Sequence, residues 1–255
     1  MAWMSGIATV EGTDVESAHA AIVRDGVVHL KAVFPAETIS QAIAIAISDQ
    51  PALAALGEGK PGNDTGEGRY IASVPITAAL RATGLFENKT LTGIGNAALG
   101  PDHVVEAFGM MMSAVGSVAQ TVHRDGVPMF PETPLDAMLP ASALVILIPA
   151  IRVGPDGGAT AFRLGSHRTA RADTSDTDIY TVDLDVGDAL VWDYRTEHCG
   201  ITNRSTHNRY AFHFTLARPF WIDHLNYNSE SDAHITGDAA TIAALGPRFV
   251  RATSV

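Results

Sequence analysis

The chain has 255 residues, 46% of them hydrophobic, and a formal net charge of −11. This length and composition allow a sizeable buried core, and we expect a single domain over residues 1–255. Its basic residues are scattered, which argues against nucleic acid or an anionic membrane as a partner. Neither a signal-peptide pattern nor an apolar run of ~18 residues is present, so we expect a cytoplasmic protein.

The first hundred or so residues carry mostly helical patterns. Thr13, followed by Glu16 three residues later, has the form of a capping box and predicts the start of a helix. The Gly-rich, charged stretch at 57–70 is typical of a surface loop, and residues 57–75 are a candidate lid over a site. The expected elements are, in order, a helix over 13–24, a strand over 25–34, a helix over 36–56 that breaks near Pro51, and the loop over 57–70.

From about residue 104 to residue 221 the pattern changes to short strands. Apolar residues occupy every second position of 180–186 and again of 210–216, which is the period of half-buried strands. Helices followed by many short strands predict a mainly β protein with flanking helices, as a sandwich or barrel. The remaining tail, 222–255, is polar and then weakly helical, and it is a second candidate lid.

A histidine and an aspartate lie two positions apart in QTVHRD. If this segment is a strand, His123 and Asp125 point to the same face. They would supply two thirds of a 2-His-1-carboxylate triad, which holds non-haem Fe(II) and leaves coordination positions open. The pair alone is weak evidence, because the same spacing also arises by chance. The natural third ligand is His198, whereas His207 in a turn and His213 in mid-strand fit less well.

Arg209 begins the strand that follows His198. If the two strands are neighbours, a guanidinium lies one strand away from the metal. A bidentate arginine there suits the far carboxylate of a dicarboxylate cosubstrate. The near end of 2-oxoglutarate would take two open positions on iron, and O2 would take the third.

The segments QTVHRD, GGATAFRLGSHR, VGDALVWDYRTEHCGITNRS and RYAFHFTLARPFW together resemble the phytanoyl-CoA dioxygenase family of Fe(II)/2-oxoglutarate oxygenases. The resemblance covers roughly residues 20–220. It implies a double-stranded β-helix of the jelly-roll, cupin-like type. It also implies oxidative decarboxylation of 2-oxoglutarate to succinate and CO2, coupled to oxidation of a substrate. The implied roles are Fe(II) binding by His123, Asp125 and His198, and cosubstrate contacts by Arg209, Gln120 and Thr160.

The expected substrate is a hydrophobic small molecule from secondary-metabolite biosynthesis. Acyl-CoA needs cations near the pocket mouth, and the segment 126–140 contains none. Met111 and Met129 are candidate substrate contacts, since flexible thioethers suit bulky apolar molecules. The carboxylate of Asp125 fills the position that halogenating members leave open for chloride, so halogenation is not expected. The family resemblance also favours a homodimer.

Other functions remain open from the sequence. A non-catalytic relative of the same fold would bind a small molecule or a partner subunit. An acyl-CoA hydroxylase, and a cupin-like metal oxygenase working without 2-oxoglutarate, are enzyme alternatives, of which Arg209 disfavours the second. Hydrolytic zinc chemistry lacks a glutamate placed as general base. The single Cys199 rules out an intramolecular disulfide and is most simply a small apolar filler.

Overall fold

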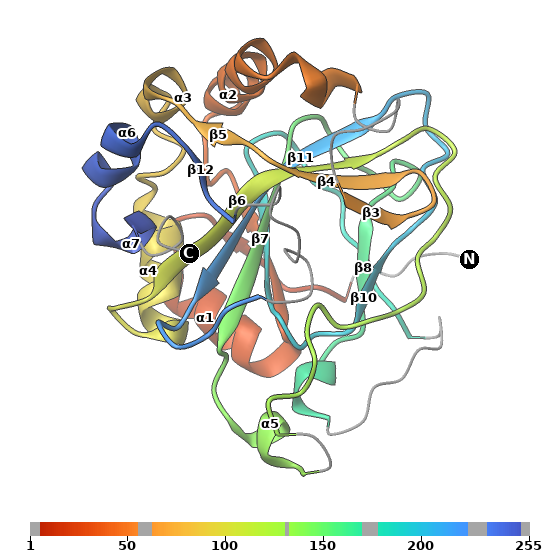
Figure 1. Cartoon of the computed structure of the whole chain (residues 1–255). Coiled ribbons are helices and arrows are strands. Elements are labelled where there is room, and N and C mark those ends of the chain that lie inside the picture. Colours follow the sequence, from red (N-terminus) through yellow and green to blue (C-terminus); the bar gives the residue numbers. More distant parts are fainter. Residues whose placement is uncertain (1–5, 56–62, 131–132, 170–177, 224–233, 251–255) are drawn as a thin grey trace.

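Most strands of the protein belong to one eight-stranded mixed sheet (Figure 1). A computed structural model describes residues 6–55, 63–130, 133–169, 178–223 and 234–250. In the large sheet β1 and β2 are parallel and the remaining neighbours antiparallel. Its strands are, in spatial order, β1 (Thr9–Glu11), β2 (Val27–Lys31), β9 (Ala189–Asp193), β7 (Ala143–Pro149), β11 (Arg209–Ala217), β6 (Val104–Ser113), β4 (Arg69–Ser73) and β3 (Asn63–Gly66).

A smaller sheet faces the large one. Its strands β8 (Thr160–Phe162) and β10 (His198–Gly200) pair antiparallel, and Figure 1 shows them beside the large sheet. Single bridges extend it on both sides, from His123 to His198 and from Phe162 to Tyr180. Two facing sheets of this kind form the double-stranded β-helix expected from the sequence, and that prediction is confirmed.

The inner faces of the two sheets share one apolar cluster. Leu147, Leu190 and Ala211 come from the large sheet, and Ala161 and Cys199 come from the small one. Their side chains face each other because every second residue of a strand points to the same side. Cys199 is buried in this cluster, as its interpretation as a filler predicts.

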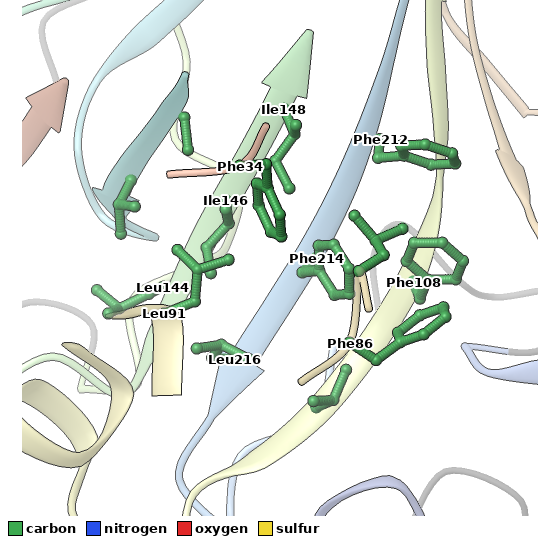
Figure 2. Packing of buried hydrophobic residues seen from close by; sticks show 14 of the residues in the cluster. Phe34, Phe86, Leu91, Phe108, Leu144, Ile146, Ile148, Phe212, Phe214 and Leu216 are labelled. Atoms are coloured by element: carbon green, nitrogen blue, oxygen red, sulfur yellow. The ribbon is translucent and has the colours of Figure 1, made fainter. Parts of the chain in front are cut away.

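The outer face of the large sheet packs against helices. Phe212, Phe214 and Leu216 of β11 lie in the second apolar cluster, where Phe108 of β6 contacts Phe212 at a ring separation of 5.6 Å (Figure 2). The predicted period of two over 210–216 is therefore confirmed, with one face of β11 toward the helices and the other toward the small sheet. The helices are α1 (Val15–Asp25), α2 (Ala36–Asp49), α3 (Ala78–Ala82), α4 (Lys89–Leu99), α6 (Ala239–Ala244) and α7 (Pro247–Val250), with α5 (Leu135–Met138) apart from them.

The helix boundaries follow local chemistry. The cap of α1 is Asp14 rather than the expected Thr13, because the Asp14 carboxylate accepts the backbone N–H of Ser17. The helix ends at Gly26, whose φ of 82° is left-handed and costs glycine little. The predicted break near Pro51 is confirmed, since α2 stops at Asp49 and a short 3-10 turn, η1 (Pro51–Ala55), follows.

Three sequence expectations are corrected by the structure. The loop expected over 57–70 is wrong in its second half, where β3 and β4 form a hairpin that pairs with β6 at the edge of the sheet. An edge strand tolerates such a glycine-rich sequence because its neighbour supplies the hydrogen bonds. The strand expected over 180–186 is reduced to bridges at Tyr180 and Leu184. Asp125 lies in a bend beyond the bridge at His123, not in a strand.

The two candidate lids are only partly described. Residues 57–62 and 224–233 fall outside the described residues, whereas β4 forms a wall of the large sheet. The expected helical character of the C-terminal tail is confirmed by α6. Before it, β12 (Thr236–Gly237) pairs parallel with β5 (Pro75–Ile76). Among the described helices, none is long and apolar enough to cross a membrane.

A buried histidine–aspartate contact joins the first strands to the turn before β9. His29 Nε2 lies 2.9 Å from Asp188 Oδ2, and the same carboxylate accepts the backbone N–H groups of Ala32 and Asp185, each at 2.9 Å. Burial raises the pKa of Asp188, but the hydrogen bonds and His29 together outweigh burial and bring it below its ordinary value. Asp188 therefore contributes stability that depends on its charge.

Changing Asp188 to asparagine is expected to lower the free energy of unfolding at pH 7 by about 1–3 kcal/mol, because one buried donor loses its acceptor. Since the folded-state pKa is depressed, the stabilisation is complete above the ordinary pKa of an aspartate. It is lost as the pH falls through the folded-state pKa. Urea unfolding across pH 7 to 3 should show the two proteins converging in acid. Asp183→Asn, at an exposed carboxylate, is the control and should change stability by less than about 0.5 kcal/mol.

Candidate active site

A cavity of about 590 Å³ lies between the small sheet and the large sheet with its β3–β4 hairpin. His123, Asp125 and His198 line it together with Arg209 and Thr160, although they come from four separate segments of the chain. Facing sheets bring these residues together because the inward side chains of both sheets converge on one space. These residues can therefore act together on a molecule bound in this cavity.

His123, Asp125 and His198 form a possible metal-binding group. Each offers one ligand atom, and these atoms all lie within 4.8 Å of one another. His198 Nε2 lies 3.4 Å from Asp125 Oδ1. Adjacent corners of a coordination polyhedron are roughly 3 Å apart for metal–nitrogen bonds of about 2.1 Å. Two imidazoles and a carboxylate are the donor set of the non-haem Fe(II) facial triad, so the residues fit that ion.

Backbone pairing brings the two histidines side by side. His123 and His198 face each other across the bridge between their segments and exchange two backbone hydrogen bonds of 2.9 Å. Their ring centroids are 4.6 Å apart. Asp125 is positioned differently, by the indole N–H of Trp192 on β9, which donates to Asp125 Oδ2 at 3.1 Å. The large sheet thus orients the carboxylate while the small sheet presents the imidazoles.

The orientation of both imidazoles is set by carbonyl groups two residues before them. His123 Nδ1 lies 2.8 Å from Thr121 O, and His198 Nδ1 lies 2.9 Å from Thr196 O. A carbonyl only accepts hydrogen bonds, so each Nδ1 carries a proton. The lone pair of a neutral ring is then on Nε2, which is available to a metal, and such orienting partners are usual at metal sites.

The three groups also shift one another's proton affinities. Burial and the neighbouring His198 lower the pKa of His123. Burial lowers the pKa of His198 too, but Asp125 outweighs it and the net shift is upward. For Asp125, burial raises the pKa and the histidines with Trp192 more than compensate, so it stays ionised. A metal ion would replace the proton that His198 holds against Asp125.

A buried charge network braces the residues beside the ligands. Glu197 is 1% exposed and accepts from Arg124 at 2.9 Å and from Arg163 at 2.8 Å. Arg124 lies between His123 and Asp125 in the chain, and Glu197 precedes His198. The network therefore ties together the two segments that carry the candidate ligands.

Changing Glu197 to glutamine is expected to lower the free energy of unfolding by about 3 kcal/mol, because two largely buried guanidinium groups lose the negative charge of Glu197. The metal-binding geometry next to it should loosen as well, weakening metal affinity by roughly 10-fold or more. Urea unfolding and a metal titration measure the two effects. Asp156→Asn is the control, because its pair with Arg204 is exposed at 3.9 Å and should be worth less than about 1 kcal/mol. Equal stability of the two variants would contradict the bracing role.

Arg209 is a buried cation with unused hydrogen-bond donors. Its Nη2 donates to Gly158 O at 3.0 Å, while its Nε and Nη1 have no partner among the described residues. Burial lowers the pKa of Arg209 to about 9, and the charge of nearby Arg69 adds to this. An unsatisfied buried guanidinium is costly, and an anion bound at this end of the cavity would offset that cost.

Arg69 is a second cation at the same end, which the sequence did not reveal. It faces Ser113 of β6 in register from one side, and Arg209 faces Ser113 from the other. Burial lowers the pKa of Arg69 to about 10. Its guanidinium donates to Val118 O at 3.2 Å and to Ile201 O. The only local signal is its place after a glycine-rich stretch, and that signal does not predict a cavity position.

Gln120 and Thr160, for which the family resemblance implies cosubstrate contacts, also line the cavity. The Gln120 amide is largely engaged, since it donates to Thr65 O at 2.6 Å and accepts from the backbone N–H of Gly200 at 2.7 Å. A Cβ at Gly200 would collide with Arg69 and lie 2.8 Å from Gln120 Oε1. Gln120 therefore joins the β3–β4 hairpin to β10, and only glycine fits beside it.

The two methionines expected to contact substrate are placed differently. Met111 of β6 lines the main cavity. Met129 lines a neighbouring hollow of about 60 Å³ and is partly exposed, because the chain turns away from the cavity after Asp125. His167 is buried, and its Nε2 lies 3.2 Å from Val23 O, in keeping with a role in the fold. His213 lines the cavity without joining the metal-binding group.

A double-stranded β-helix that presents two imidazoles and a carboxylate to one cavity is the arrangement found in non-haem Fe(II) oxygenases. The phytanoyl-CoA dioxygenase family matches residues 22–211, which is most of the chain. The chain therefore belongs to the phytanoyl-CoA dioxygenase family. It is an Fe(II)- and 2-oxoglutarate-dependent enzyme, as the sequence resemblance implied.

Solved structures share the fold at low sequence identity. AviO1 from Streptomyces viridochromogenes Tue57 superposes with a TM-score of 0.62 at 19% identity, covering 81% of this chain and 96% of its own. SnoN, the non-heme alpha-ketoglutarate-dependent epimerase from nogalamycin biosynthesis, superposes with a TM-score of 0.59 at 20% identity. The match covers 88% of this chain and 93% of SnoN. HygX from Streptomyces hygroscopicus, with nickel and 2-oxoglutarate bound, superposes with a TM-score of 0.61 at 12% identity. The match covers 88% of this chain and 96% of HygX.

Proposed function

We propose that His123, Asp125 and His198 hold the iron, and that Arg209 with Arg69 binds the distal carboxylate of 2-oxoglutarate. The observation that carries the proposal is the pairing of two features in one cavity. A set of three metal ligands lies in the same space as a buried guanidinium whose Nε and Nη1 have no described partner. A dicarboxylate that reaches from the metal to the guanidinium would coordinate the metal at one end and accept hydrogen bonds from these N–H groups at the other.

The residues of this chain perform the remaining tasks. Iron with 2-oxoglutarate and O2 supplies the oxidising power that removes hydrogen from a substrate carbon. Arg209 and Arg69 compensate the charge of the distal carboxylate of 2-oxoglutarate. Thr160, which carries a hydroxyl group, lines the same cavity. Trp192 holds the Asp125 carboxylate in place.

The substrate proposed for this cavity is a mainly apolar small molecule that undergoes hydroxylation, desaturation or rearrangement. Its walls carry Ile71, Met111, Val145 and Leu147. Arg69 and Arg209 are the only cations among the described residues that line it, and both lie at the cosubstrate end. An acyl-CoA would bring phosphates that these walls do not match. SnoN has been solved in complex with nogalamycin RO and HygX with hygromycin B bound, and both support a natural product as substrate.

An anaerobic titration of the protein with Fe(II) and 2-oxoglutarate tests the proposed function. A weak visible charge-transfer band is expected only when both are present. Iron binding without any effect of 2-oxoglutarate would favour a metal oxygenase that works without this cosubstrate. Failure to bind either would favour the non-catalytic relative. The expected homodimer stays a prediction, which sedimentation of the same sample measures.

A further inference from the structure

The cavity continues beyond the metal-binding residues to a polar end. Along the inner face of β11, Arg209, His213 and Thr215 all line the cavity, and the six steps along the strand from Arg209 to Thr215 span roughly 20 Å. On β9, Trp192 contacts Asp125 and Tyr194 lies two residues further on. The space past the triad is therefore bounded by different residues from those at the cosubstrate end.

The polar end is organised around Asp223. The Tyr194 hydroxyl donates to Asp223 Oδ2 at 2.6 Å, and both residues are largely buried and line the cavity. Behind them the backbone N–H of Asp223 donates to Glu106 Oε1 at 3.2 Å, and His234 Nδ1 lies 2.9 Å from the same oxygen. Hydrogen bonds at its backbone N–H and at its carboxylate thus help to fix the position of Asp223 and the direction of its carboxylate.

The two ends of the cavity differ in charge. Arg209 and Arg69 make the cosubstrate end positive, whereas the lining at the other end includes Asp223 and no described Lys or Arg. Arg218, close to it in sequence, donates to the carbonyl groups of Ala98 and Ala141 instead. Burial lowers the pKa of His213 to about 4, so this cavity histidine is uncharged at neutral pH. The far end therefore repels anions and accepts hydrogen bonds.

We propose that Asp223, held by Tyr194 and accompanied by Thr215, anchors the substrate through one hydrogen-bond-donating group, a hydroxyl or a protonated amine. The inference rests on the proposed function, because it takes the end near Arg209 to be filled by 2-oxoglutarate. It narrows the substrate class to a mainly apolar molecule with one donor at the end that lies beyond the metal. A substrate that ends in a carboxylate or phosphate does not fit this anchor.

Four probes that share one ring test the anchor: benzylammonium, benzyl alcohol, toluene and benzoate. Binding is measured by calorimetry to the anaerobic protein loaded with Fe(II) and 2-oxoglutarate. The two donor probes are expected to bind about tenfold or more tightly than toluene, and benzoate more weakly than toluene. Toluene or benzoate binding as tightly as the donor probes, or no binding by any probe, would overturn the proposal. A preference for only one donor probe identifies the group as amine or hydroxyl.

Variants locate the preference at the anchor. Asp223→Asn is expected to remove the advantage of benzylammonium, and Tyr194→Phe to reduce it, while toluene binding stays unchanged. Met111→Leu is the matched cavity control, because it keeps the volume and should leave the ranking of the probes intact. A ranking that survives in Asp223→Asn also overturns the proposal. The affinity for 2-oxoglutarate, measured in the same samples, tests the proposed function separately. If 2-oxoglutarate does not bind, the probe series repeated without it still tests the anchor.

Discussion

Replacing His198 with alanine is expected to abolish the visible band of the Fe(II)–2-oxoglutarate complex and to weaken Fe(II) binding by more than about 100-fold. Loss of a residue that merely orients a metal ligand already costs 10–100-fold, and here one of three ligands disappears. His198 Nε2 also lies 3.4 Å from Asp125 Oδ1, so the carboxylate loses this contact as well. The remaining His123 and Asp125 do not provide a facial triad.

Equilibrium dialysis with Fe(II) under anaerobic conditions measures the affinity, and the visible spectrum reports the complex. His213→Gln is the matched control, because His213 is another buried histidine that lines the same cavity but lies outside the metal-binding group. It is expected to keep the band. If His213→Gln lost the band while His198→Ala kept it, the ligand assignment would be wrong. Circular dichroism of both variants shows that any loss of binding is not a loss of fold.

Replacing Arg209 with glutamine is expected to weaken 2-oxoglutarate binding by on the order of 100-fold, because buried charge-assisted hydrogen bonds to the distal carboxylate are lost. The stability of the protein without cosubstrate should not fall in this variant. Arg209 has unsatisfied Nε and Nη1 groups and a pKa lowered to about 9 by burial. Removing an uncompensated buried charge is expected to leave the stability of the free protein unchanged or slightly higher.

Thermal unfolding with and without 2-oxoglutarate separates these effects. At a concentration of 100 times its wild-type Kd, the cosubstrate stabilises the native state by about 2.7 kcal/mol, and a variant with 100-fold weaker binding retains less than about 0.5 kcal/mol of that. Arg218→Gln is the control, since Arg218 follows β11 directly but donates to Ala98 O and Ala141 O away from the cavity. That variant should lose stability and keep cosubstrate affinity. Normal cosubstrate stabilisation of the Arg209 variant would contradict its assigned role.

Local patterns in the sequence predicted the features that depend on one buried face. The alternation over 210–216, the break of α2 at Pro51 and the helical C-terminal segment follow from short-range geometry, and the structure contains all three. A strand has a period of two and a helix a period of 3.6 wherever they pack, so these elements can be predicted from the sequence before the fold is known. His123, Asp125 and His198 were identified by their residue types and by the family resemblance, and the structure brings them together.

The tertiary structure alone decided which distant residues share the cavity. Arg69 and Arg209 are neighbours because their strands flank β6 and meet Ser113 in register, and no local pattern encodes a register between strands so far apart in the chain. Asp125 is held by Trp192 across the cavity rather than by a strand of its own. Asp223 faces the same space through Tyr194 and Glu106. Residue identities and periodicities are properties of the chain, whereas convergence of side chains on one cavity depends on how the two sheets face each other.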